Sequence, residues 1–210
     1  MRTITVNGSG SAEIAPDRAT LQVSIVAKEA TVAAAQKVAA DVTNNVLKMT
    51  DKMRIARDQV DTTGASIRAD YRWNPKTEEQ ELRGYIAQRQ ITIVIDDLEQ
   101  LGAVVEGAVG AGVNQVSPPQ LESSQRKETY RQALRAAALD ARANATALAE
   151  TLGARLGDAI KVNSASNVSR PPVPYANMRA MAAESDAVES YNAADLSFDA
   201  DVTVVFELTE

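Results

Sequence analysis

The sequence predicts an α+β fold in which a mainly antiparallel sheet carries two long helices on one of its faces. Several segments alternate apolar and polar residues, which is typical of a strand with one buried face. Two longer segments repeat apolar residues every three or four positions, as one face of a helix does. Short turns between neighbouring strands indicate antiparallel hairpins. The predicted order is β-β-α-β-β-α-β-α-β-β, in a single domain over residues 1–210.

Two strands are predicted at the N-terminal end. Residues 3–7 form the first, and Gly8-Ser9-Gly10 is expected to turn the chain after it. A phosphate-binding loop is the alternative interpretation of these glycines, but such a loop precedes a helix, and here a strand follows. Pro16-Asp17 indicates an edge or a bulge before the second strand. The buried face of that strand is expected to hold Ala19, Leu21, Val23 and Ile25.

A long helix and a hairpin are predicted next. Residues 28–54 repeat apolar side chains at helical spacing. A strand that alternates up to Trp73 is then joined by a polar loop at 74–79 to a return strand at 82–95. The expected apolar face of the helix holds Ala35, Ala39, Val42, Val46, Met49 and Met53.

A short helix and a weak strand are predicted in the middle of the chain. Asp96 or Asp97 is expected to cap the helix, and Gly110 and Gly112 to end it. The strand, at residues 113–122, contains Pro118-Pro119. Because proline cannot donate a backbone hydrogen bond, we expect this strand at a sheet edge.

The second long helix is predicted at residues 123–152, with Gly153 as a left-handed stop. Two strands follow, at 158–166 and 195–208, and a long irregular insertion at about 168–194 separates them. The expected apolar stripe of the helix is mostly alanine, which lets a helix lie close to its neighbour. It holds Tyr130, Leu134, Ala137, Ala141, Ala145, Leu148 and Leu152.

The composition excludes several classes of catalytic site. The chain has no histidine and no cysteine, so Ser-His-Asp and Cys-His catalysis, disulfides and thiolate zinc sites are excluded. Ser-Lys, carboxylate-pair and oxygen-ligated Mg²⁺ or Ca²⁺ chemistry stay open. The net charge of −6, without a dense run of Lys or Arg, disfavours nucleic acid and anionic lipid as partners. We expect no catalytic residues, no cofactor and no metal.

Two charged groups have a functional and a structural interpretation. Asp96-Asp97 resembles a carboxylate pair for acid or metal chemistry, but helix capping is favoured. The last long helix carries an arginine group that would suit an anion. Glu128 and Asp140 offset part of its charge, so a solvated face is favoured. The arginines are Arg131, Arg135 and Arg142.

Aromatic and methionine side chains are the candidates for an interface. Those on the predicted hairpin either pack within the sheet, which is the favoured interpretation, or contact a partner. The insertion is too polar for a core and too long for a simple connection, so its aromatic and methionine side chains are available to dock on a neighbour. The candidate residues are Tyr71, Trp73, Tyr85, Tyr175, Met178, Met181 and Tyr191.

Segments along nearly the whole chain resemble, in order, the SIMPL-domain family. Each segment is weak evidence alone, and the ordered set is specific. The segments are Ile4-Thr5-Val6-Asn7-Gly8-Ser9-Gly10, Ala15-Pro16-Asp17-Arg18-Ala19, Gly84-Tyr85-Ile86-Ala87, Ile91-Thr92-Ile93-Val94, Gly112-Val113-Asn114-Gln115-Val116 and Val202-Thr203-Val204-Val205-Phe206-Glu207-Leu208.

The resemblance implies a compartment and no reaction. Bacterial members are mostly periplasmic or associated with the outer membrane, some are antigens, and some are linked to protection from oxidative stress. It therefore implies an exported, periplasmic protein whose signal peptide is missing from this sequence, with a peripheral association with the envelope as a further expectation. The sequence itself has no stretch of about 20 apolar residues, so we expect no transmembrane segment. The family has no established catalytic residues to carry over.

Three hypotheses about function follow. The first is a non-enzymatic envelope protein that acts by self-assembly into a homo-oligomer or by binding partners, with a role in oxidative-stress protection. The second is a periplasmic module that binds a small ligand or a peptide. The third is a hydrolase that uses carboxylates or a Ser-Lys pair.

We predict that the protein holds no structural transition metal. Without histidine and cysteine it offers only hard oxygen ligands, which favour Mg²⁺ or Ca²⁺ over later metals. Elemental analysis of the purified protein should find zinc, copper and iron far below one atom per chain. A stoichiometric amount of any of the three would contradict the prediction.

Overall fold

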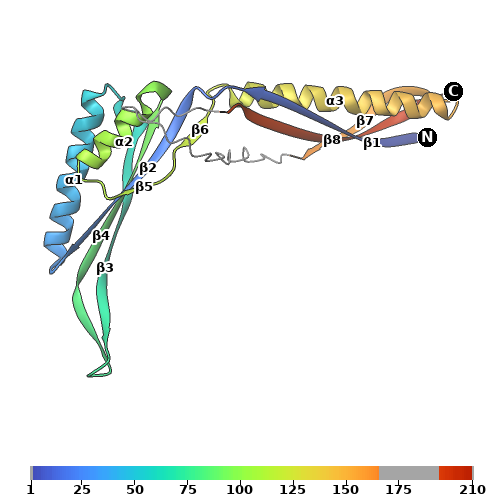
Figure 1. Cartoon of the computed structure of the whole chain (residues 1–210). Coiled ribbons are helices and arrows are strands. Elements are labelled where there is room, and N and C mark those ends of the chain that lie inside the picture. The colour runs from blue at the N-terminus through green and yellow to red at the C-terminus, as the bar shows by residue number, and fades with distance from the viewer. Residues whose placement is uncertain (1, 166–193, 210) are drawn as a thin grey trace, which may run out of the picture. The chain divides into compact units, whose positions relative to one another are not determined.

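The structure is a computed structural model that describes residues 2–165 and 194–209 (Figure 1). Pairs of strands are separated by helices along the chain, with η marking 3-10 helices. The elements are β1 (Thr3–Ile14), β2 (Arg18–Glu29), α1 (Val32–Lys52), η1 (Arg57–Gln59), β3 (Val60–Asn74), β4 (Glu79–Ile95), η2 (Leu98–Gln100), α2 (Leu101–Gly110), β5 (Gln115–Val116), β6 (Gln120–Glu122), α3 (Arg126–Thr151), β7 (Arg155–Ala165) and β8 (Leu196–Thr209).

The α+β class and the antiparallel pairing are confirmed, but the described strands form two sheets. A first unit (residues 2–16, 123–165 and 194–209) holds the sheet β1-β8-β7, and a second unit (residues 17–122) holds β3-β4-β2-β5, with β6 also on β2. The prediction that both long helices cover one sheet face is wrong. Alternation along a strand shows which side is buried, and it does not show which strands share a sheet. The predicted single folding domain stays a prediction.

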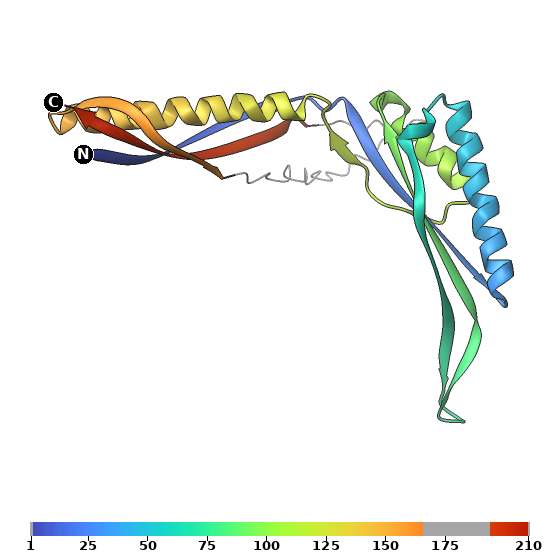
Figure 2. The ribbon, with the colours of Figure 1, turned by 180° about the vertical axis from the view of Figure 1, so that it is seen from behind.

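The core of the second unit lies between its sheet and α1 and α2, which cover the same face (Figures 1 and 2). The predicted buried face of β2 is confirmed and continues to Ala27. The predicted face of α1 is confirmed in outline, since its partly buried Val42, Met49 and Met53 pack on this core. Buried positions on α1 are Ala35, Ala39, Thr43, Val46 and Thr50.

Helix α1 begins later than predicted, because β2 takes the preceding residues. Strand β2 stays paired with β4 as far as Glu29 opposite Tyr85. The helix begins at Val32, where the Thr31 hydroxyl oxygen accepts a hydrogen bond from the Ala34 amide at 3.2 Å. This is an N-cap, which satisfies one of the free amides of the first turn.

The predicted edge strand at residues 113–122 is two short strands. Both β5 and β6 pair with β2, and Pro118-Pro119 lies between them. The edge position is confirmed by the strand order, whereas the predicted order of elements lacks the second strand. Two consecutive prolines interrupt the ladder because neither has an N–H to donate.

Gly8-Ser9-Gly10 does not form a turn, because β1 continues straight through it, with Gly8 opposite Val202. A Cβ at Gly8 would lie 2.2 Å from the Ala137 carbonyl oxygen and 2.4 Å from the Ala141 amide nitrogen. A Cβ at Gly10 would lie 2.4 Å from the Ala137 nitrogen. The two glycines are therefore the positions at which the backbone of α3 touches the backbone of β1.

The face of α3 that meets the sheet is an alanine row at every fourth position. It packs against β1 and against the buried side chains of β8, among them Val204 and Phe206. The predicted stripe is wrong for Leu148 and Leu152, which are 47% and 71% exposed, because the contact distance leaves no room for leucine. The left-handed Gly153 is confirmed, with φ 74. The buried residues are Thr129, Ala133, Ala137, Ala141, Ala145 and Ala149.

Helix α3 also closes the free edge of β1, the strand at one side of the first sheet. The Ser9 amide donates to the Asp140 carboxylate at 3.0 Å. The Asn144 side-chain amide donates to the Asn7 carbonyl at 3.3 Å. These bonds satisfy backbone groups that would otherwise be free to pair with another strand.

We predict that Gly8→Ala lowers the free energy of unfolding of the first unit by more than about 2 kcal/mol, because the added methyl overlaps backbone atoms that cannot step aside. Leu148→Ala should cost about 1 kcal/mol or less, since that side chain is half exposed. Urea denaturation followed by circular dichroism measures both, and hydrogen exchange of β1 amides assigns the effect to the first unit. Equal stability of the two variants would contradict the packing described here.

Candidate functional site

The outer part of the β3–β4 hairpin projects beyond its own sheet and beyond α1 (Figure 1). Pairing between β2 and β4 ends at Glu29 opposite Tyr85, whereas β3 and β4 continue to pair as far as Asn74 opposite Glu79. Residues 70–84 are therefore held only by each other, and we call this segment the arm. An isolated two-stranded ribbon is marginally stable in water, so its turn and its base need local support.

The turn of the arm is organised by Asn74. Its side-chain oxygen accepts a hydrogen bond from the Lys76 amide at 2.9 Å, and its side-chain amide donates to Glu81 at 2.6 Å. The Asn74 carbonyl accepts from the Glu78 amide at 2.9 Å. Glu78 adopts a left-handed conformation with φ 54. The polar loop predicted at residues 74–79 is thus a hydrogen-bonded turn.

The base of the arm is a β-bulge at Gly84. The register shifts between Asp70 and Tyr71, where Arg83 is the extra residue on β4. Gly84 has φ 153, and a Cβ there would lie 2.4 Å from the Glu29 carbonyl oxygen. Only glycine fits both the conformation and the space.

One face of the arm carries exposed aromatic and aliphatic side chains. Tyr71 and Trp73 are each 57% exposed, and Leu82, which lies opposite Tyr71, is 50% exposed. The face continues toward the sheet through Ile67 and Tyr85, because alternate residues of β3 share a side and Tyr85 pairs with Ala69. The register therefore places Tyr71, Trp73 and Tyr85 on one face of the hairpin. Sequence reasoning missed Leu82, because its place depends on the register shift.

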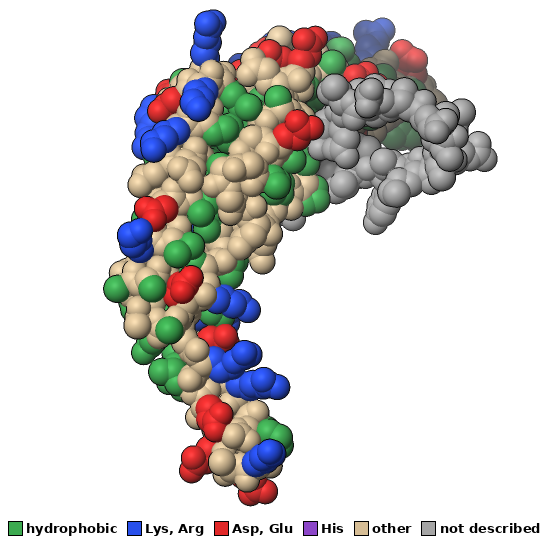
Figure 3. Space-filling model, turned by 60° about the vertical axis from the view of Figure 1, so that its left-hand side comes forward, with side chains coloured by type: hydrophobic (Ala, Val, Ile, Leu, Met, Phe, Trp, Pro, Cys, Tyr) green, Lys and Arg blue, Asp and Glu red, His purple; other side chains and the backbone are tan. Residues whose placement is uncertain are grey.

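Charges along the hairpin are separated by sign. Figure 3 shows acidic side chains near the end of the arm and basic side chains farther along it. The acidic end contains Glu78, Glu79 and Glu81, with Lys76 among them, and the basic part contains Arg68, Arg72 and Arg83, with Asp70 among them. Arg72 lies opposite Glu81 in the ladder, where the two parts meet.

Asp96 and Asp97 have structural roles. Asp97 accepts from the Glu99 amide at 3.0 Å, which confirms the predicted cap on the 3-10 turn before α2. Asp96 lies 3.6 Å from the Arg18 guanidinium and accepts a hydrogen bond from the Gln59 side chain. Both carboxylates thus have partners within the fold.

The arginine group on α3 is partly neutralised on the helix itself. Arg131 and Arg135 lie 3.2 and 3.3 Å from the two carboxylate oxygens of Glu128. All three side chains are largely exposed, and ion pairs of this kind contribute about 0–1 kcal/mol. The solvated face favoured from the sequence agrees with this geometry.

The Asp61 carboxylate is hydrogen-bonded to the backbone near the start of β3. The Thr63 amide donates to its carboxylate at 2.8 Å, and this bond, followed by the bond from the Thr63 hydroxyl, holds the pKa of Asp61 below its usual range. The contact lies at the first register shift of β3. A carboxylate held ionised in this way supports the bend and is a poor proton donor.

Within residues 2–165 and 194–209, no three Asp and Glu side chains come close enough to hold a metal ion. The helices of this described part are all too short or too polar to span a membrane. Four candidate interface residues lie outside the described residues, and their predicted role stays a prediction. They are Tyr175, Met178, Met181 and Tyr191.

Comparison with known proteins gives a family and several relatives. The sequence model of the family described as "SIMPL: Protein of unknown function (DUF541)" matches residues 4–206. The chain is 30% identical over 208 residues to the "Uncharacterized protein YggE" of Escherichia coli, covering 98% of this chain and 82% of the relative. It is 27% identical over 213 residues to the "26 kDa periplasmic immunogenic protein" of Brucella melitensis, covering 98% of this chain and 84% of that protein.

We predict that Gly84→Ala lowers the free energy of unfolding of the second unit by more than about 2 kcal/mol, because alanine fits neither the backbone conformation nor the space beside Glu29. Gly110→Ala is the matched control. A Cβ there meets nothing within 4 Å, so it should be neutral or stabilise the helix by up to about 1 kcal/mol. Circular dichroism follows both in urea. A Gly84→Ala protein as stable as the control would show that the bulge is dispensable.

Proposed function

Because this chain belongs to the SIMPL family, we propose that it is a non-enzymatic periplasmic protein that assembles with further copies of itself through the arm. The Brucella relative is named a periplasmic immunogenic protein, which supports the compartment. Family membership supplies no reaction, since the family is described as one of unknown function. The assembly is argued from the arm.

The observation that carries the proposal is the exposed apolar face of the arm. Folding of the second unit does not bury it, because that unit has its own core on the helix-covered part of the sheet. Tyr71, Trp73 and Leu82 stay about half exposed on the ribbon. A contact that buried their apolar surface would therefore be favourable. Tyrosine and tryptophan are also the side chains that most often carry the energy of an interface.

A second copy suits this surface because the charges of the arm are self-complementary. If two arms lie side by side and antiparallel, the acidic end of each faces the basic part of the other. That arrangement has two-fold symmetry, in which the same patch is used on both partners. In it the aromatic faces meet, whereas Glu79, Glu81, Arg68 and Arg72 lie on the opposite face of each ribbon, so the charges act through the field of the two arms and not through ion pairs across the contact.

A role without catalysis agrees with the chemistry of the chain. There is no histidine or cysteine, and the carboxylates Asp96 and Asp97 are engaged in the fold. The role in oxidative-stress protection rests on the family resemblance alone. Binding of another envelope protein to the arm is the second form of the proposal, and it predicts the same aromatic contact without a rise in mass.

Multi-angle light scattering on the intact protein at micromolar concentration should give a mass above one chain. The double change Tyr71→Ser with Trp73→Ser should lower that mass, because it removes the apolar anchors of the contact. Leu139→Ser with Leu152→Ser is the matched control, since both leucines are more exposed than the aromatic pair but lie away from the arm, Leu139 on α3 and Leu152 at its C-terminal cap. A monomeric intact protein, or an arm variant with unchanged mass, would contradict assembly through the arm.

A charge reversal tests the antiparallel arrangement separately. Changing the acidic end to lysine should reduce association, because like charges then face each other. Changing the basic part to glutamate in the same chain should restore it. Restoration is the expected result, and failure of the doubly reversed protein to associate would exclude this pairing. The positions are Glu78, Glu79 and Glu81 for lysine, and Arg68, Arg72 and Arg83 for glutamate.

A further inference from the structure

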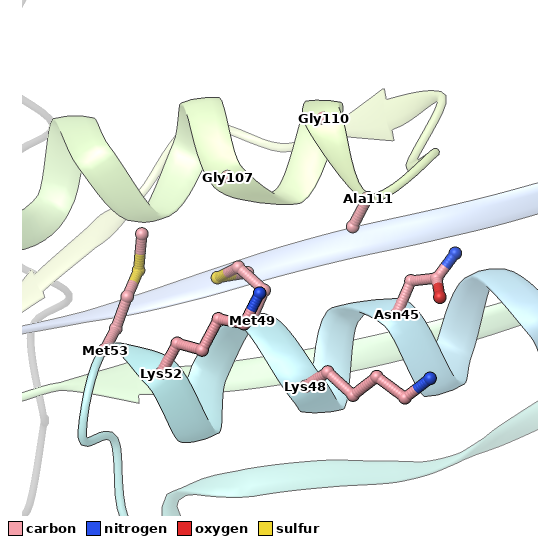
Figure 4. Close-up of a pocket in the computed structure, with 8 residues that line it drawn as sticks. All are labelled: Asn45, Lys48, Met49, Lys52, Met53, Gly107, Gly110 and Ala111. Atoms are coloured by element: carbon pink, nitrogen blue, oxygen red, sulfur yellow. The ribbon is translucent and has the colours of Figure 1, made fainter.

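A groove of about 370 Å³ lies between α1 and α2 in the second unit (Figure 4). It is open to solvent along one side, so a ligand would lie along it and would not be enclosed. Figure 4 shows the methionine side chains of α1 reaching toward α2, and the lysine side chains running along the open side. The lining residues are Asn45, Lys48, Met49, Lys52, Met53, Gly107, Gly110 and Ala111.

The groove exists because α2 presents almost no side chains to α1 at this place. At Gly107 the helices are in contact, since a Cβ there would lie 3.0 Å from Met49 Cγ and 3.1 Å from Met53 Cε. One turn farther, a Cβ at Gly110 would meet nothing within 4 Å. The space therefore opens at Gly110 and Ala111, over a floor of helix backbone and methionine.

Two lysines stand at the rim without a partner of opposite charge. Lys48 and Lys52 are exposed, and neither forms an ion pair with a described carboxylate, although Asp51 is adjacent to Lys52 on α1 and Glu106 precedes Gly107 on α2. Like charges four residues apart weaken a helix slightly. In a chain of net charge −6, two unpaired cations beside an apolar floor favour an anionic ligand.

We propose that this groove binds a single-chain amphiphile with an anionic head, such as a fatty-acid carboxylate or a lysophospholipid phosphate. The chain lies on Met49 and Met53, whose flexible thioethers adapt to an irregular apolar ligand. The head is held by Lys48 and Lys52. A peptide suits the groove less well, because the helix backbones that form its floor are already hydrogen-bonded and only Asn45 offers an amide.

The proposal stands apart from assembly, because the groove and the arm share no residue. Helix α2 crosses α1 at a patch that the sheet does not need, since its buried anchors Leu101, Val104 and Ala108 face the core on its other side. A ligand in the groove would therefore bind without disturbing that core. The second hypothesis drawn from the sequence, a module for a small ligand, here acquires a place and a chemical class.

Binding is tested with decanoate below its critical micelle concentration, by calorimetry and by the ¹³C-methyl signals of methionine. Decanoate should bind and shift the signals of Met49 and Met53. Decyltrimethylammonium, with the same chain and the opposite charge, should not. Monodecyl phosphate and a lysophosphatidylglycerol then separate a carboxylate head from a phosphate head and a free acid from a lipid. Equal binding of the cationic probe, or no shift at either methionine, would overturn the proposal.

Two variants place the ligand in the groove. Lys48→Gln with Lys52→Gln should weaken decanoate by about tenfold, whereas Lys28→Gln with Lys76→Gln, which removes the same charge elsewhere, should not. Gly110→Leu should abolish binding, because leucine fills the groove where the backbone leaves room for it. Tyr71→Ser with Trp73→Ser should bind decanoate normally, so failure of assembly and failure of this site are distinguishable. Unchanged affinity in both the lysine and the Gly110 variants would refute the site.

Discussion

The close contact between β1 and the alanine face of α3 is the constraint on which the first unit depends. Gly8 and Gly10 remove two side chains from the strand, and alanine keeps the facing side of the helix small, so backbone meets backbone. That distance lets Asp140 and Asn144 reach past the strand and satisfy its outer backbone groups. The same close contact thus provides both the packing of the unit and the protection of the edge of β1. The strand and the helix that make this contact are separated in sequence by residues 17–122, which form the second unit.

The second unit, in contrast, leaves apolar side chains exposed at its periphery. Its core is conventional, with aliphatic residues of β2 and β4 under α1 and α2. Beyond that core, the arm keeps aromatic side chains in solvent although Gly84 and Asn74 hold its shape. The bulge at Gly84 and the hydrogen bonds of Asn74 stabilise an exposed apolar ribbon that the core of the unit does not require. The groove beside Gly110 has the same character, since a larger residue would fit there and would improve the helix.

Periodicity predicted the elements that are buried on one side, such as β2, the apolar face of α1 and the hairpin of β3 and β4. It could not assign α1 and α3 to separate sheets, because a buried face does not name its partner. Gly8-Ser9-Gly10 was misinterpreted because glycine marks both turns and close backbone contacts, and the two differ only in what approaches. In the same way Leu148 fits a helical stripe by spacing, while the face is decided by the size that the contact admits. The aromatic candidates were found, but Leu82 needed the bulge register. The groove could not be predicted from the sequence, because it forms where α2 has glycine and alanine and therefore no large side chain.

The most direct test of assembly through the arm is a distance between copies. The chain has no cysteine, so one spin label can be attached at an introduced cysteine, either at Thr77 in the turn or at Ser66 toward the sheet. Antiparallel pairing predicts that Thr77 of one copy lies nearer to Ser66 of its neighbour than to the neighbour's Thr77. Pulsed electron resonance on mixed and singly labelled samples should therefore give the shorter distance for the mixed pair. No coupling between copies, or a shorter distance between the two turns, would contradict it.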